Sequence, residues 1–286
     1  MGLQALGYLS VAMFFFLSGY GLEVQIRIKG KKYLSNFVGG RLLPYYSVYL
    51  MTVIVYFLYR LIILKQSFGL IAWIKTLTFG ETFVANGWYF QTLLVIYILF
   101  FIAAKLFFSR RTSMMAILLL LFAITCHNIG LSTTWYESVF AFVVGMIFCN
   151  YKDKVDEYFS KRNRWIICTI VCMVLLGITL LLGNLLILPV GRVPIKMLSA
   201  VIFVFFGILM IMKIKISNHV TRLLGNYYLE IYAMQGVALI LLHSEYINIE
   251  NGVWYTLMVI IITIVLSVVV HPLYAAVRKK CRIIVK

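Results

Sequence analysis

Apolar segments of about 20 residues recur from one end of this 286-residue chain to the other. A helix needs about 20 apolar residues to cross a hydrocarbon core roughly 30 Å thick. Only 12% of the residues are charged, which is about half the share in an average soluble domain. The recurring segments therefore predict an all-α, polytopic integral membrane helix bundle.

About nine membrane-spanning helices are predicted, joined by connectors that leave no room for a soluble domain. The whole chain, residues 1–286, is accordingly predicted to form a single transmembrane domain. The predicted spans are approximately 5–22, 42–64, 87–108, 112–130, 133–150, 165–188, 195–212, 222–243 and 253–277.

The distribution of cations predicts the orientation of these spans. Of the 26 lysines and arginines, 21 lie in the connectors of one side or in the C-terminal tail. Such a bias marks the cytoplasmic side of a membrane protein, so the C-terminus is predicted to be cytoplasmic. The net charge of +17 is divided among separate connectors. We therefore expect a lipid bilayer as the surroundings and no nucleic acid as a partner.

The stretch from Phe14 to Tyr46 combines glycines, cations and a proline. Gly19 and Gly21 are predicted to break the first helix and to free backbone N–H groups. Arg41 precedes Pro44 by three residues, and proline suits the first turn of the next helix. A broken helix end beside cations is one interpretation of this stretch, as a binding site for the phosphates of a nucleotide-type cofactor. The alternative is an ordinary cation-rich cytoplasmic connector.

Two predicted spans carry polar side chains that lipid would not tolerate. Gln91 follows the aromatic opening Trp88-Tyr89-Phe90 and should face the bundle. The aromatic opening itself fits either a belt at the membrane interface or a binding site. Glu230 lies inside the eighth span, where a carboxylate is costly unless it is paired or faces water. It either serves a functional site or pairs with Arg222 or another cation near the inner face.

Three further residues have ordinary structural interpretations. His127 ends the fourth span, where it is either a base or a hydrogen-bonded terminal residue. Glu137 at the start of the fifth span is favourable with the helix dipole. His271 precedes Pro272 in the last span and is interpreted as structural. The five cysteines show no zinc spacing, so no metal is expected.

Four motifs, in order along the chain, resemble the bacterial membrane acyltransferase 3 family. The stretch FFFLSGYGL followed by RLLPYY is similar to that family's F-F-x-x-S-G-[FY] segment and R-x-x-P turn. Trp88-Tyr89 and Tyr97 resemble its W-[FY]-L…Y segment, and Phe142 to Met146 its F-x-x-G-M pattern. Residues 224–235 resemble L-G-x-x-S-x-x-[IV]-Y-L-x-H, except that Tyr228 and Gln235 replace the usual serine and histidine.

The resemblance implies an O-acyltransferase of the bacterial inner membrane. Its donor would be acetyl-CoA or another acyl-CoA, and its acceptor a hydroxyl of a cell-surface polysaccharide or of a lipid-linked precursor. Arg41 would contact the donor phosphates, and Ser18, Gly19 and Tyr20 would shape the adjoining cofactor-binding wall. The residues implied to line a substrate channel are Trp88, Tyr89, Glu230 and Tyr232.

The family usually has ten spans, and its catalytic histidine belongs to the first of them. That helix is not found in this chain, and none of the four histidines (His127, His219, His243, His271) lies in the matching motif. No catalytic residue is therefore predicted. The alternatives are a non-catalytic membrane protein that binds or transports a glycolipid or polysaccharide, an inactive remnant, and a scaffold for glycan assembly.

Overall fold

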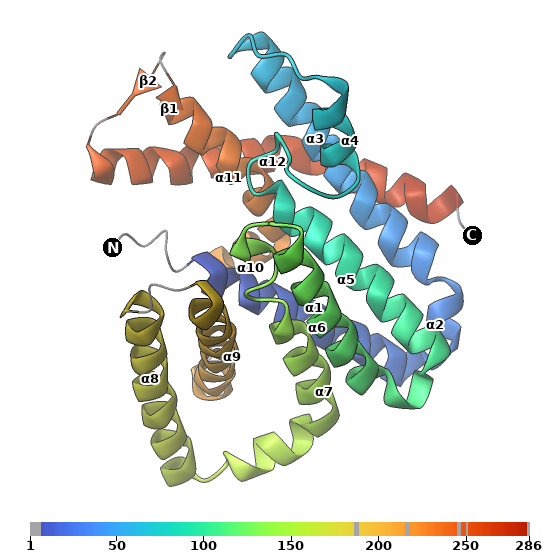
Figure 1. Ribbon diagram of the computed structural model, residues 1–286, viewed down its shortest axis with the longest axis vertical. Helices are drawn as coiled ribbons and strands as arrows, with labels where there is room; N and C mark the ends of the chain where they lie inside the picture. The colour runs from blue at the N-terminus through green and yellow to red at the C-terminus, as the bar shows by residue number, and fades with distance from the viewer. Residues whose placement is uncertain (1–6, 186–188, 215–217, 245–246, 250, 285–286) are drawn as a thin grey trace. The chain divides into compact units, whose positions relative to one another are not determined.

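A computed structural model describes residues 7–185, 189–214, 218–244, 247–249 and 251–284 (Figure 1). Helices make up nearly all of it, which confirms the predicted all-α class. The chain divides into two compact units, and one of the boundaries between them falls within the helix Gly87–Leu106. The first unit comprises Met1–Ser35 with Val95–Ile216, and the second comprises Asn36–Leu94 with Ser217–Lys286.

The first unit is built from two pairs of long helices that pack together. Helix α1 packs along α7, α8 packs along α9, and both α1 and α7 contact α9 (Figure 1). Its elements are α1 (Gly7–Lys29), α2 (Lys32–Ser35), the second half of α5 (Gly87–Leu106), η3 (Phe108–Arg110), α6 (Arg111–Asn128), η4 (Thr133–Trp135), α7 (Phe140–Tyr158), α8 (Arg162–Leu185) and α9 (Pro189–Lys213).

The second unit is organised around the long C-terminal helix α12. This helix packs against α11, α3 and η2. The elements are η2 (Val38–Leu42), α3 (Leu43–Ile62), α4 (Leu70–Leu77), the first half of α5, α10 (His219–Asn226), α11 (Tyr228–Leu242), β1 (His243–Ser244), β2 (Ile247–Asn248) and α12 (Gly252–Ile284). Strands β1 and β2 are antiparallel, with His243 opposite Asn248.

Within the described ranges, seven helices are long and apolar enough to cross a membrane. The protein is therefore a multi-pass membrane protein. The two other predicted spans correspond to α7 and to α11, a shorter apolar helix. Helix α7 begins at Phe140 rather than at residue 133, because the short helix η4 and a turn precede it. Residues 5 and 6, where the first predicted span begins, lie outside the described residues.

The predicted helix break at Gly19 and Gly21 is wrong. Helix α1 runs without interruption from Gly7 to Lys29. A Cβ atom on Gly19 would overlap the carbonyl oxygen of Phe142 in α7, and one on Gly145 would overlap the carbonyl oxygen of Phe16. Small residues at such a crossing let two membrane helices approach backbone to backbone. Gly19 therefore serves the packing of α1 against α7.

The eighth predicted span, 222–243, is two helices instead of one. Helix α10 ends at Asn226 and α11 begins at Tyr228. Gly225 and Asn226 are weak helix formers, which favours a break at this point. The second span also differs from its prediction, because the π-helical turn η2 extends it upstream to Val38. Pro44 occupies the first turn of α3, as predicted.

Candidate functional site

A fully buried carboxylate lies in the second unit, in the first turn of α11. Glu230 is 0% exposed. Its Oε1 atom accepts a hydrogen bond from the guanidinium group of Arg278 and lies 3.1 Å from Nδ1 of His271. Its Oε2 atom is also buried but has no hydrogen-bond partner among the residues that the structure describes. Buried polar atoms are almost always hydrogen-bonded, so an exception calls for an explanation such as a ligand.

The partners of Glu230 come from one face of α12. His271, Tyr274 and Arg278 follow one another at spacings of three and four residues, which places them on the same side of a helix. The hydroxyl of Tyr274 lies 2.7 Å from Oγ1 of Thr52 in α3. This contact and the packing of α12 on α11 hold His271 and Arg278 beside the carboxylate.

One of the two interpretations of Glu230 from the sequence was a pair with Arg222 or another cation. The partner is Arg278, and His271, which was interpreted as structural, is the second group at the same oxygen. The helical spacing of 271, 274 and 278 was the available indication. The spacing alone does not predict which other helix packs against this face of α12.

The cluster of Glu230, His271 and Arg278 is buried on one side and accessible on the other. The side chains of His271 and Arg278 are 34% and 30% exposed, whereas that of Glu230 is 1% exposed. The carboxylate of Glu230 and the guanidinium group of Arg278 carry opposite charges. The free carboxylate oxygen can accept a hydrogen bond from a hydroxyl group, and the imidazole can donate or accept a proton.

The three aromatic residues predicted to line a channel contact one another. The ring centroids of Tyr89 and Tyr232 are 4.5 Å apart, and Trp88 meets Tyr89 edge to face at 6.3 Å. Both tyrosines are buried. Trp88 and Tyr89 lie in the first half of α5, and Glu230 and Tyr232 lie on α11. All four predicted channel residues therefore belong to the second unit. Their role as a channel stays a prediction.

Gln91 anchors the start of α5 within this unit. Its amide nitrogen donates to the Tyr49 hydroxyl at 3.1 Å and to the carbonyl oxygens of Lys75 and Thr76 at 2.9 Å each. Its amide oxygen accepts from the backbone N–H of Gly80 at 3.0 Å. The prediction that Gln91 faces the bundle is confirmed. These bonds fix the helix that carries Trp88 and Tyr89.

The residues predicted to bind the donor are divided between the two units. Arg41 lies in η2 of the second unit, and η2 packs against α3 and α12. Ser18, Gly19 and Tyr20 lie on α1 of the first unit. Gly19 is buried against α7, whereas the ring of Tyr20 stacks on Phe16. Their role in donor binding stays a prediction.

Polar residues of the first unit are satisfied by one another. Glu137 is 2% exposed and accepts hydrogen bonds from Lys196 at 2.8 Å and from Thr133 at 2.9 Å. Nδ1 of His127 lies 3.1 Å from the hydroxyl of Tyr136. The contact of His127 matches its interpretation as a hydrogen-bonded terminal residue. Glu137 pairs with Lys196, and the predicted interaction with a helix dipole is wrong because α7 begins only at Phe140. Across the described ranges, no three histidine, cysteine or acidic side chains form a group that could hold a metal ion.

Comparison with known proteins identifies the family. A family model described as an acyltransferase domain, that of the acyltransferase 3 family, matches residues 1–271. Neither the comparison with curated proteins nor the comparison with solved structures gave a match. The match covers almost the whole chain, including the predicted donor residues, Glu230 and His271, and it ends before Arg278. The chain therefore belongs to the acyltransferase 3 family of membrane acyltransferases.

Proposed function

We propose that this protein transfers an acetyl group from acetyl-CoA to a hydroxyl of a cell-surface polysaccharide or of its lipid-linked precursor. The family match supports acyl transfer, and the apolar helices support a membrane location. The bias of cations supports a bacterial plasma membrane with the C-terminus in the cytoplasm. In the reaction, the thioester C–S bond breaks, an ester C–O bond forms, and the hydroxyl proton passes to the sulfur of CoA.

The observation that carries this proposal is the buried Oε2 atom of Glu230, which has no hydrogen-bond partner in the described part of the chain. A buried carboxylate oxygen without a donor costs free energy comparable to a lost hydrogen bond. The cost is offset when a ligand hydroxyl donates to that oxygen, while Arg278 and His271 hold Oε1 in place. An acceptor sugar supplies such hydroxyl groups. Trp88, Tyr89 and Tyr232 would form the aromatic wall beside them, as in many ligand sites.

Arg41 would hold the donor. Its guanidinium group can make two parallel hydrogen bonds to a phosphate oxygen pair, which a lysine cannot do. Ser18, Gly19 and Tyr20 would form the adjoining wall, as the family resemblance implies. Because Gly19 is buried against α7, its part in this wall would be to let α1 lie close to α7, leaving Ser18 and Tyr20 as the contacting side chains.

The test is transfer of labelled acetyl from acetyl-CoA to a glycan acceptor by the full chain in membrane vesicles. Glu230→Gln should lower kcat/KM for the acceptor about 10- to 100-fold, the cost of losing a hydrogen bond to a charged group. Glu157→Gln, which changes a carboxylate in a solvated segment, is the matched control. A wild-type chain that binds the glycan without transferring acetyl would instead favour the non-catalytic binding protein.

A further inference from the structure

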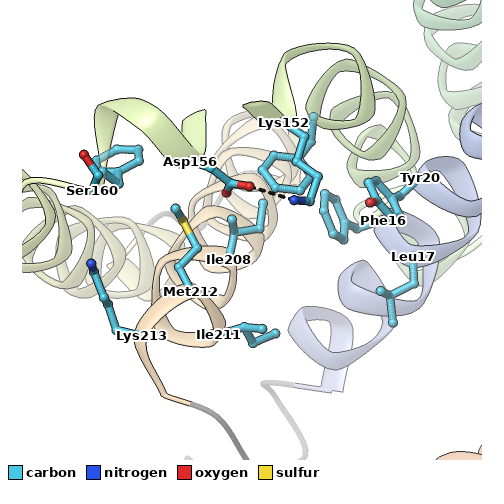
Figure 2. Close-up of a pocket in the computed structure, with 12 residues that line it drawn as sticks. Phe16, Leu17, Tyr20, Lys152, Asp156, Ser160, Ile208, Ile211, Met212 and Lys213 are labelled. Carbon is cyan, nitrogen blue, oxygen red and sulfur yellow. Dashed lines mark hydrogen bonds and ion pairs between the residues drawn. The ribbon is translucent and has the colours of Figure 1, made fainter. Parts of the chain in front are cut away.

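A groove of about 520 Å³ lies in the first unit, between α1, α7 and α9 (Figure 2). Its volume is within the range of about 300–1,000 Å³ that is usual for small-molecule sites. One wall is aromatic and comes from α1 and α7, where Phe16, Tyr20 and Phe148 contact one another with centroids 5.7–6.3 Å apart. The opposite wall is aliphatic and comes from the last turns of α9, with Ile208 and Met212.

The groove changes from apolar to polar along its length. Its polar residues lie near the ends of α7 and α9, where predicted cytoplasmic connectors begin: Lys152, Asp156, Ser160 and Lys213. At the groove's edge, Leu17 and Ile211 are 55% and 66% exposed. An apolar chain can therefore enter from the surrounding bilayer while its polar end stays at the membrane interface.

The charges in the groove leave one positive charge unbalanced. Nζ of Lys152 is 2.6 Å from the carboxylate of Asp156, so these two groups neutralise each other (Figure 2). Lys213 lies at the end of α9 and has no ion pair within the described part of the chain. A ligand with a single negative charge matches this arrangement. The several phosphate charges of a CoA ester would need several cations.

We propose that this groove binds an anionic glycerophospholipid, with one acyl chain between α1, α7 and α9 and its phosphate beside Lys213 and Lys152. Basic pockets between transmembrane helices at the cytoplasmic side are known to bind anionic head groups. The apolar walls bury the chain, and each buried methylene contributes favourable transfer free energy. The inference does not depend on the proposed acceptor, whose residues lie in the second unit. Tyr20 is shared with the wall proposed for the donor, so an acyl-CoA bound there would compete with the lipid.

The test measures lipid binding to the purified full chain by native mass spectrometry, without donor or acceptor. Phosphatidylglycerol should bind more tightly than phosphatidylcholine with the same chains. Lys213→Gln should weaken phosphatidylglycerol binding about five-fold, the effect expected of one cation near a lipid surface. Asp156→Asn should strengthen it by a similar factor, because it removes the carboxylate that offsets Lys152. Met212→Trp should fill the apolar part and weaken both lipids.

Matched controls separate the groove from the general surface charge. Glu157→Gln removes a carboxylate next to Asp156 on α7, and Lys161→Gln removes a lysine from the connector that follows α7. Neither residue lines the groove, so neither substitution should alter binding. Equal binding of the two lipids, or equal effects of Lys213→Gln and Lys161→Gln, would overturn the proposal. Displacement of the lipid by acetyl-CoA would also overturn it and would assign the groove to the donor. A failed transfer assay would leave this measurement unaffected.

Discussion

Among the residues that the structure describes, Glu23 and Glu230 are fully buried glutamates that each pair with an arginine, and their oxygens are hydrogen-bonded to different degrees. Glu23 on α1 of the first unit uses both oxygens: Arg111 donates from Nε to Oε2 at 3.0 Å and from its terminal nitrogen to Oε1. Arg111 also donates to the carbonyl oxygen of Phe108. Glu230 on α11 of the second unit is bonded through Oε1, which His271 and Arg278 share, and its Oε2 atom meets no donor within the described ranges.

The difference distinguishes a structural ion pair from a candidate binding group. A carboxylate whose oxygens are all hydrogen-bonded has its desolvation offset within the fold. A carboxylate with one unpartnered buried oxygen still bears part of that cost, and such groups deserve a functional explanation. Substitution of Glu23 should therefore lower the stability of the fold, whereas substitution of Glu230 should impair acceptor binding and acetyl transfer.

The largest expected effect is the loss of stability from Glu23→Ala. Removing one member of a buried ion pair leaves an uncompensated charge, and here Arg111 is only 14% exposed. The free energy of unfolding should fall by about 3–5 kcal/mol. Denaturant or thermal unfolding of the detergent-purified chain measures it. Glu230→Ala should cost less, because Arg278 can turn toward solvent. If Glu23→Ala and Glu230→Ala lowered the free energy of unfolding equally, the distinction between a structural and a ligand-binding carboxylate would be refuted.

Arg41→Ala tests whether ligand binding belongs to the second unit. Loss of a charged hydrogen bond to a phosphate should raise KM for acetyl-CoA about ten-fold or more, with a small change in the unfolding midpoint. The exposed Arg164 serves as the matched control. An Arg41→Ala enzyme with the wild-type KM would refute donor binding by this residue. Full activity of Arg41→Ala and Glu230→Gln together would favour the scaffold alternative.

Gly19→Ala tests the close packing of the helix that carries Glu23. The added methyl group would meet the Phe142 backbone, so α1 and α7 must separate, at a cost of about 1–3 kcal/mol. Gly21→Ala is the control on the same helix, because a Cβ atom there would meet no described atom within 4 Å apart from its chain neighbours and the backbone of its own helix. It should be neutral or stabilising by up to about 1 kcal/mol. Similar unfolding midpoints for the two variants would contradict the packing role of Gly19.

Local patterns in the sequence predicted the helices well. Apolar length alone located the spans, because the bilayer sets the number of residues needed to cross it. The polarity of Gln91 inside a span correctly placed its side chain in the bundle. Both inferences depend only on a residue and its immediate surroundings in lipid.

Some failures are local, such as the break between α10 and α11 and the late start of α7. The failures that affect the candidate site concern contacts between distant segments. Gly19 was interpreted as a helix breaker because its local effect is to loosen a helix, whereas its role is set by the backbone of α7, more than 100 residues away. The partners of Glu230 follow it by 41 and 48 residues on another helix. Residue type identified Glu230 as a candidate, but only the packing of α12 on α11 shows that one oxygen is satisfied and the other is not.

The most direct test compares Glu230→Gln and Glu23→Gln in one experiment that records acetyl transfer per folded molecule and the unfolding midpoint. We expect Glu230→Gln to lose about 10- to 100-fold in transfer while its midpoint stays near that of the wild type. Glu23→Gln should lower the midpoint and leave transfer per folded molecule nearly unchanged. Wild-type transfer by Glu230→Gln, or a loss no greater than its loss of folded protein, would contradict the assignment of Glu230 to the acceptor site.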